Sequence, residues 1–330
     1  RLDFTCMMDK LGTPALAGSI PYFQPDSGRK DCIIGHTGGG TTAVGQIKLQ
    51  WTPTEDIKLL LTARHRREDL EETPNVALGF RAACFDTPDC VASAGAQAYH
   101  RATYNTFGVI MGSQFVTPER DGGIYDTYAT NCRPSIDQSG GGFPAGYPDG
   151  FCYEPRKFAR HTLLSAKLEA ALSENVNMTA IGGYTKYSNE FTAHADHSPL
   201  APVISHFINL DEMYSGELRF DGSLFDDKLK WVLGGFTVKT DGYQNNLISV
   251  HGVNKSSSGF VHLDYNITDA WRISGGGRFT HTDIAITIDN PQAVSVLDPI
   301  HSTQDRWDWL ISTDYKINDD ILLYASAASG

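Results

Sequence analysis

The feature that most constrains this chain is an alternation of apolar and polar residues that resumes after short turns. Residues 259–283 read GFVHLDYNITDAWRISGGGRFTHTD, in which apolar residues alternate with polar ones before the turn, at Val261, Leu263, Tyr265 and Ile267, and again after it, at Trp271, Ile273 and Phe279. Because successive side chains of a β-strand point to opposite faces, this pattern predicts a hairpin with one apolar and one polar face. The pattern alone leaves open whether the apolar face contacts a protein core or lipid.

The same unit occurs five times, which predicts ten antiparallel strands in an all-β fold. The predicted turns are short and read TPTED, SEN, FDD, TDA and NDD, whereas the connections between hairpins are long, at about 67–158, 192–206, 242–256 and 287–304. Short turns at one end of a sheet and long loops at the other are typical of an outer-membrane β-barrel. A soluble β-sandwich would have more even loop lengths.

The distribution of charge and aromatic residues fits the same interpretation. The polar faces carry charges of both signs, which suits a wet barrel lumen as well as the solvated face of a sandwich. Aromatic residues lie next to the short turns, where an interfacial girdle would be expected, at Trp51, Phe225, Trp231, Tyr265 and Trp271. The net charge of -12 argues against a nucleic-acid partner. Together, these features favour a membrane barrel over a sandwich.

Six cysteines lie in segments that lack the alternation. Many pairings are possible from sequence alone. We predict that nearest neighbours in the sequence pair, because each disulfide would then stabilise a loop that cannot build a core of its own. The predicted disulfides are Cys6–Cys32, Cys84–Cys90 and Cys132–Cys152. Disulfides persist outside the cytosol. Reduced, partly buried thiols are the alternative.

Three stretches resemble the barrel region of TonB-dependent receptors of the Gram-negative outer membrane. They are YSGELRFDGSLFDDKLKWVLGGFTVKTDG at 214–242, the opening stretch at 259–283, and WDWLISTDYKINDDILLYASAASG at 307–330; VGQIKLQWTPTEDIKLLLTARHRRED at 44–69 matches more loosely. The resemblance covers about 41–66 and 160–330. It implies a transmembrane barrel of roughly 22 strands, of which the chain would supply about ten, and residence in the outer membrane among its lipids.

The resemblance also implies a domain organisation. The whole of 1–330 would belong to one β-barrel domain: 1–42 is predicted to be a loop, 43–66 a hairpin, 67–158 a long extracellular loop containing disulfides, and 159–330 four further hairpins. The family's plug domain, its TonB box and the last barrel strands are not found in the given sequence, and no signal peptide is visible in it. We therefore expect a fragment of a longer receptor, coupled to a TonB-type protein through a plug outside this chain.

Candidate binding residues fall in the predicted outer loops. The HADH motif places His194, Asp196 and His197 together, and imidazole and carboxylate groups can contact a chelated metal. Loop 67–158 is rich in tyrosine and arginine, including Tyr125, Tyr128 and Arg133, and such side chains suit a siderophore, glycan or protein ligand. A solvated loop and ordinary loop packing are the competing interpretations of these two groups.

No catalytic motif is present. The sequence contains neither a G-x-S-x-G nor an H-E-x-x-H motif, and its three GGG runs are not followed by the residues of a phosphate-binding loop. We therefore expect no enzyme activity, no cofactor and no resident metal. The leading hypothesis is a receptor that binds and imports a scarce, large solute of the siderophore-iron, cobalamin or glycan type. The alternatives are a secreted or surface glycan-binding or adhesion protein, and a barrel that serves mainly as an assembly partner through loop 67–158.

Overall fold

A computed structural model describes two compact parts of the chain. The residues described are 1–11, 31–72, 76, 115–117, 126–129, 132–133, 151–194, 199, 204–245, 249–289 and 299–329. The first unit comprises 1–42, 68–158 and 190–207, and the second comprises 43–67, 159–189 and 208–330. No helix in the described ranges is long and apolar enough to cross a membrane.

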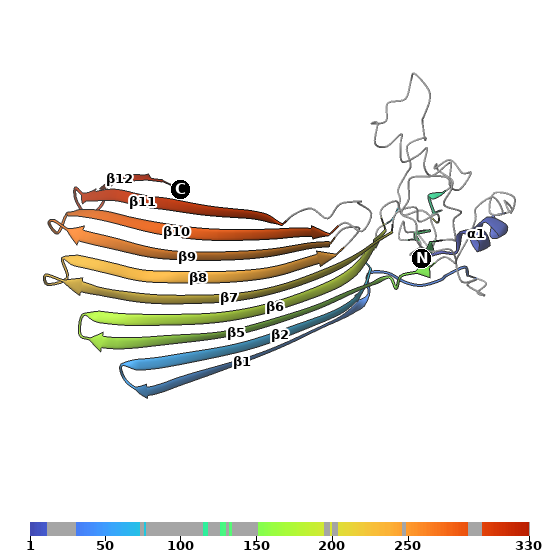
Figure 1. Ribbon diagram of the computed structural model, residues 1–330, viewed down its shortest axis with the longest axis horizontal. Coiled ribbons are helices and arrows are strands. Elements are labelled where there is room, and N and C mark those ends of the chain that lie inside the picture. The colour runs from blue at the N-terminus through green and yellow to red at the C-terminus, as the bar shows by residue number, and fades with distance from the viewer. Residues whose placement is uncertain are drawn as a thin grey trace, which may run out of the picture. The chain divides into compact units, whose positions relative to one another are not determined.

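The dominant element is a ten-stranded sheet in which strands follow one another in chain order, from β1 at one edge to β12 at the other (Figure 1). The strands are β1 (Gly40–Thr54), β2 (Ile57–Glu71), β5 (Arg156–Ser173), β6 (Val176–His194), β7 (Ile204–Leu224), β8 (Leu229–Asn245), β9 (Ser249–Asn266), β10 (Trp271–Asp289), β11 (Ile300–Lys316) and β12 (Leu322–Ala328). The registers from β7 to β12 are antiparallel. The predicted all-β architecture of ten strands joined as hairpins is confirmed.

The short turns form where local side-chain chemistry favours them. In the β7–β8 turn, Phe225, Asp226 and Asp227 have φ values of 59°, 53° and 65°, a region that aspartate tolerates better than most residues. In the β11–β12 turn, the Asn318 side-chain oxygen accepts hydrogen bonds from the backbone N–H groups of Asp320 and Ile321, both at 2.9 Å. Both turns lie where the sequence predicts them.

The strands extend further than the sequence predicts. β8 continues to Asn245 and β9 begins at Ser249, so most of the loop predicted at 242–256 is strand. Likewise, β10 continues to Asp289, and the loop predicted at 287–304 is shortened from both sides. The prediction of long loops here was wrong because it required sustained hydrophobic alternation, and in these strand ends single apolar residues such as Val250, Val253 and Ile300 stand among polar ones.

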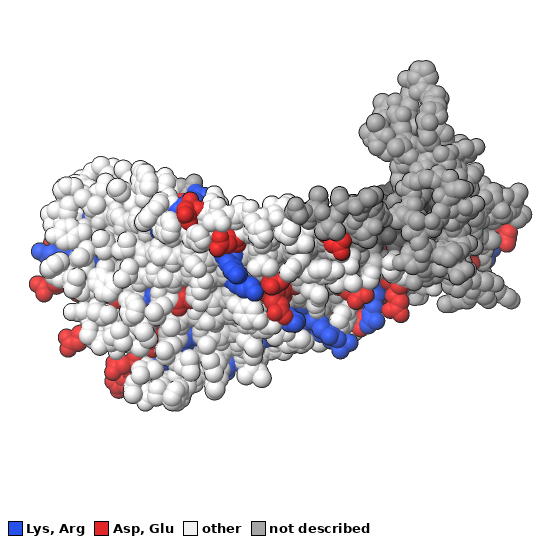
Figure 2. Space-filling view, in the orientation of Figure 1, with Lys and Arg blue, Asp and Glu red and all other residues white. Residues whose placement is uncertain are grey.

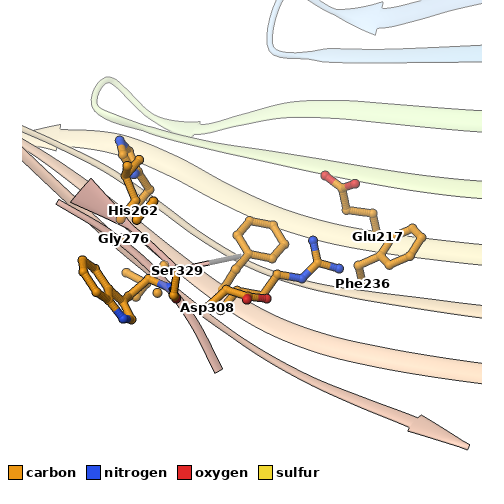
Figure 3. Close-up of a pocket in the computed structure, with 13 residues that line it drawn as sticks. Glu217, Phe236, His262, Gly276, Asp308 and Ser329 are labelled. Atoms are coloured by element: carbon orange, nitrogen blue, oxygen red, sulfur yellow. The ribbon is translucent and has the colours of Figure 1, made fainter. Parts of the chain in front are cut away.

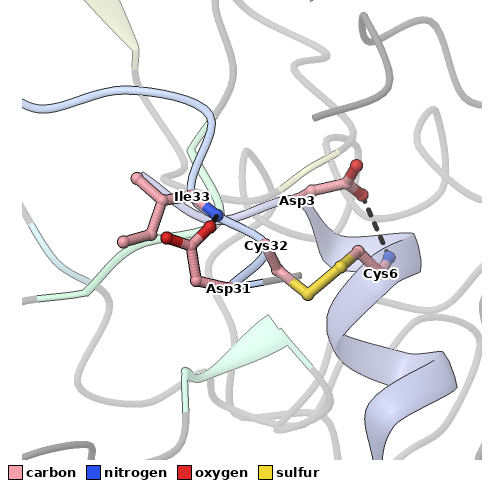
Figure 4. Close-up of a disulfide and its surroundings, with 5 residues drawn as sticks. All are labelled: Asp3, Cys6, Asp31, Cys32 and Ile33. Carbon is pink, nitrogen blue, oxygen red and sulfur yellow. Dashed lines mark hydrogen bonds between the residues drawn. A yellow bond between two sulfur atoms is a disulfide. The ribbon is translucent and has the colours of Figure 1, made fainter. Parts of the chain in front are cut away.

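The first unit has a small core of its own. Helix α1 (Phe4–Lys10) is capped by Asp3, whose carboxylate accepts the Cys6 N–H at 3.1 Å, and a disulfide joins Cys6 to Cys32 (Figure 4). The backbone N–H of Asp3 donates to the Cys32 carbonyl at 2.8 Å. Leu2, Cys32, Phe115 and Tyr128 are fully buried. Residues 1–42 therefore contain a helix, which their prediction as a loop did not anticipate.

The other predicted disulfides have different outcomes. Cys132 and Cys152 are register partners in the short pair formed by β3 (Cys132–Arg133) and β4 (Phe151–Cys152). This backbone pairing brings the two residues opposite each other, and their disulfide stays a prediction. Cys84 and Cys90 lie outside the described residues.

Candidate functional site: the outer and inner faces of the sheet

The sheet has two chemically different faces. Cross-strand partners share a face, and from β8 to β11 the registers pair odd residues with odd and even with even, as in Leu233 with Val261 and Gly277 with Trp309. The odd face of these strands carries large exposed hydrophobic side chains, including Leu233, Val261, Leu263, Tyr265, Trp271, Ile273, Trp307, Trp309, Ile311 and Tyr315. We call this the outer face, and the opposite one the inner face.

The apolar part of the outer face has the same height on five of the strands. Counting outward-facing residues from the turn ends of β6, β8, β9, β10 and β11, the first lysine, histidine or acidic side chain comes ten positions along, from Val176 to Lys186, Leu229 to Lys239, Tyr265 to Lys255, Trp271 to His281 and Tyr315 to Asp305; on β7 it comes twelve positions along, from Leu224 to Glu212. Ten residues at about 3.4 Å each, tilted by roughly 40°, span about 25 Å. This is the height of the apolar band of outer-membrane barrels.

Aromatic residues form the upper rim of the apolar band. The rings of Tyr184 and Tyr214 lie 4.9 Å apart, and those of Phe279 and Trp307 lie 4.8 Å apart. Each pair stands just before the first ionisable residue of its strand. Aromatic side chains of this kind belong at the boundary between hydrocarbon and headgroups.

Beyond this rim the outer face becomes polar. The charged belt, as we call it, consists of Lys186, Glu212, Lys239, Asp241, His251, Lys255, His281, Asp283 and Asp305. Its members pair across strands: Lys186 Nζ lies 2.5 Å from Glu212 Oε1, and His281 Nδ1 lies 2.6 Å from Asp305 Oδ1. In Figure 2 charged residues cross the sheet as a diagonal stripe, and the surface between it and the turns is largely uncharged.

The inner face carries cation–carboxylate pairs along most of the sheet. Arg272 Nε lies 2.9 Å from Asp314 Oδ1 across β10 and β11, and Lys167 Nζ lies 2.6 Å from Glu169 Oε1 on β5. Arg306 and Asp308 pair at 2.7 Å on β11. Partly exposed pairs of both signs suit contact with water, so this face has the character of a barrel lumen.

A hollow of about 670 Å³ lies on the inner face (Figure 3). Its lining includes Glu217, Phe236, Phe260, His262, Arg278 and Asp308. Glycine makes room for the ring of Phe260, because a Cβ on Gly234 would stand 2.5 Å from the ring's Cζ atom. Two aromatic rings beside charges of both signs can contact a large polar solute.

The first unit contains a second group of polar and aromatic side chains. The His206 ring stacks on Tyr153 with centroids 4.7 Å apart, and its Nε2 lies 3.0 Å from Glu190 Oε1. Sequence reasoning missed His206 and Glu190, because they lie on β7 and β6 and only strand pairing brings them together. No sequence signal marks this pair.

The predicted binding residues fall mostly where the structure gives no side-chain position. His194 is the last residue of β6 and Arg133 lies in β3, while Asp196, His197 and Tyr125 are outside the described residues. Tyr128 is only 1% exposed, so its side chain packs inside the first unit and does not face a solute. Among the described residues, no group of three or more histidine, cysteine or acidic side chains is placed to hold a metal ion.

Comparisons with known proteins agree with this architecture. Residues 95–330 match the family model described as TonB dependent receptor-like, beta-barrel. No curated protein matches the sequence.

Three similar solved structures illustrate the likeness. The ferric yersiniabactin uptake receptor FyuA from Yersinia pestis is 13% identical, with a TM-score of 0.52, over 93% of this chain and 39% of that chain. The siderophore receptor PiuA from Acinetobacter baumannii is 10% identical, with a TM-score of 0.54, over 89% and 43%. The ferric citrate transporter FecA in its unliganded form is 11% identical, with a TM-score of 0.53, over 87% and 36%.

At these identities the three structures establish a shared fold, and the chain spans about two fifths of their length. The family match covers most of the chain and includes β5 to β12 of the sheet whose outer face carries the apolar band. The chain therefore belongs to the TonB-dependent receptors, in which it forms part of the β-barrel in the Gram-negative outer membrane.

Proposed function

We propose that this chain forms part of the wall of a receptor that binds and imports a scarce, large solute of the siderophore-iron, cobalamin or glycan type. The observation that carries this proposal is the inner face, where ion pairs surround a hollow of about 670 Å³ on the side opposite the apolar band. The similar structures are named as receptors or transporters of ferric siderophores and ferric citrate. A ferric chelate is therefore the first solute to test.

We also propose how the solute is captured and what supplies the energy for its import. The chain would form one β-barrel domain in which loop 67–158 and the HADH segment face outward and capture the solute. The proposed capture residues are His194, Asp196, His197, Tyr125 and Arg133, with Tyr128 supporting the loop from inside the first unit. Energy would come from a TonB-type protein acting through a plug domain. The family is one of receptors and transporters, and we propose no enzymatic role.

Two aspartates of β11 provide a matched test. Asp308 lines the inner hollow, whereas Asp305 belongs to the charged belt on the outer face of the same strand. In the full-length receptor, Asp308→Ala is expected to raise the half-saturation concentration for uptake of labelled ferric chelates, and Asp305→Ala is expected to leave it unchanged. Equal effects of the two substitutions, at equal amounts of folded receptor, would contradict a role for the inner hollow in solute passage.

The assembly-partner alternative predicts a different pattern. If loop 67–158 mainly docks another surface protein, its deletion abolishes that complex and leaves uptake intact. If it captures solute, its deletion reduces uptake at low solute concentration. Uptake and co-purification measured on the same deletion strain distinguish the two.

A further inference from the structure

One imidazole of the charged belt lies between two carboxylates. The His281 Nδ1 atom lies 2.6 Å from Asp305 Oδ1 across the β10–β11 pair, and its Nε2 atom lies 3.3 Å from Asp283 Oδ2 on its own strand. An ionised carboxylate accepts hydrogen bonds and donates none, whereas a neutral imidazole has only one N–H group. Only the doubly protonated ring can donate to both carboxylates, so this arrangement fits the imidazolium cation.

The two carboxylates differ in their other partners. Asp283 also accepts a hydrogen bond from Thr303 Oγ1 at 2.9 Å, and it lies opposite Lys255 of β9 in the register. Among the described residues, Asp305 has no partner besides His281. Loss of the second ring proton would leave Asp305 without a cation beside it, and it would turn a nitrogen lone pair toward one of the two carboxylates. The charged groups that face His281 from the described strands are Asp283, Asp305 and Lys255.

This cluster stands where the apolar band ends on β10 and β11. The register partners Phe279 and Trp307, which belong to the aromatic rim, come directly before the partners His281 and Asp305. Among the described residues of the two strands beyond this rim, His281 and Asp305 form the one ion pair that links β10 to β11. Apart from the Thr303–Asp283 hydrogen bond on the same face, the backbone ladder is what else joins the strands on this side.

The other cross-strand pairs of the belt respond differently to pH. Lys186 and Glu212 link β6 to β7, and lysine and glutamate both keep their charges between about pH 5 and 8. Histidine loses its charge within this range.

A second histidine of the belt has a substitute cation. On β8 and β9, His251 Nε2 lies 2.8 Å from Asp241 Oδ1, but Lys239 Nζ lies 3.5 Å from the same carboxylate. Asp241 therefore keeps a cation when His251 is neutral, whereas Asp305 does not when His281 is neutral.

We propose that His281 is a pH-sensitive link that holds β10 to β11 beyond the aromatic rim at acidic pH and weakens this pairing at alkaline pH. The charged imidazole neutralises Asp305 and lies between it and Asp283. When the ring loses its charge as the pH rises, the two aspartates repel each other across the strand pair, and Lys255 is the one cation left beside them. Because the backbone ladder persists, the strands open more often without separating.

The test compares hydrogen exchange on two strand pairs of the same receptor. The full-length receptor in phospholipid vesicles is labelled at about pH 5.5 and about pH 8.5, on either side of the titration of histidine. Each rate is divided by that of an unprotected amide at the same pH, which gives a protection factor for local opening. Peptides from 282–289 and 300–304 report on the proposed link, and the parts of β6 and β7 around Lys186 and Glu212 are the internal reference.

Three variants separate the role of His281 from a general effect of pH. His281→Lys supplies a cation that keeps its charge throughout this range, and His281→Gln supplies none. His301→Gln removes another outward histidine of this strand pair, one that pairs with no described residue. Asp305→Asn keeps the shape of the partner and removes its charge, so it tests the link without altering His281.

In the unaltered receptor, we expect protection of 282–289 and 300–304 to be about threefold lower at alkaline pH, which is the effect of one partly exposed ion pair. The loss should disappear in His281→Lys, which stays protected at both pH values, and in His281→Gln and Asp305→Asn, which are less protected at both. His301→Gln should behave as the unaltered receptor does. A pH effect that persists in His281→Gln or Asp305→Asn, or one of equal size on β6 and β7, would overturn the proposal. Uptake plays no part in this readout, so the result is independent of the proposed function.

Discussion

Substituting Val261 by arginine tests the assignment of the two faces most directly. Val261 is 42% exposed on the outer face, four residues from Tyr265 at the turn end of β9 and six from Lys255 in the charged belt. Four residues correspond to about 10 Å of depth, close to the midplane of the apolar band. An outward arginine at this depth costs about 2–4 kcal/mol. At Tyr265, near the interface, the same substitution costs about 0–1 kcal/mol.

The neighbouring inner-face residue supplies the control. His262 follows Val261 in the chain and faces the polar side, so His262→Arg is expected to change the free energy of unfolding by less than about 1 kcal/mol. The three variants of the full-length receptor are refolded into phospholipid vesicles and titrated with guanidinium, with tryptophan fluorescence as the signal. A cost for Val261→Arg no greater than that for His262→Arg would refute the face assignment. Equal costs for Val261→Arg and Tyr265→Arg would refute the placement of Val261 near the midplane of the membrane and of Tyr265 near its interface.

Two further substitutions test local packing. Gly222→Ala should destabilise the receptor by about 1–3 kcal/mol, because its Cβ would stand 2.2 Å from the Asn175 carbonyl oxygen; Gly252→Ala, whose Cβ meets nothing within 4 Å, should stay within about 0.5 kcal/mol. Equal denaturation midpoints for the two would contradict this packing. Cys6→Ala opens the disulfide to Cys32, 26 residues away, and should cost the first unit about 3 kcal/mol. Limited proteolysis should then cut residues 1–42 faster, and an unchanged rate would argue against a structural role for the bond.

The turns and the apolar band could be predicted from the sequence because both depend on local chemistry. Aspartate tolerates positive φ, and the FDD turn has this geometry at Asp226 and Asp227. Asn318 closes its own turn through hydrogen bonds to residues two and three positions ahead. Within the band, apolar residues alternate with polar ones because one face of each strand contacts lipid and the other contacts water.

The strand ends beyond the charged belt could not be predicted in the same way. In residues 249–256 each face carries a single valine among polar residues and glycine, Val250 on one face and Val253 on the other, so there is no hydrophobic period to detect. These residues are strand because β8 and β10 pair with them, as Lys255 does with Lys239 and Asp283. An apolar hollow on the outer face was equally undetectable from the sequence, because its lining residues come from five strands, β1, β2, β5, β6 and β7.

Turn length, as much as alternation, determines which side chains face the lipid. Four residues separate the register partners Leu224 and Leu229, so outward positions change from even numbers on β7 to odd numbers on β8. Five residues separate Asn266 from Arg272, and the outward positions stay odd from β9 to β10. A turn longer or shorter by one residue would exchange the two faces of every later strand. The apolar residues also change from even to odd numbers at the β7–β8 turn. Because turn length and hydrophobic pattern change together, the apolar band stays on one face of the sheet from β7 to β11.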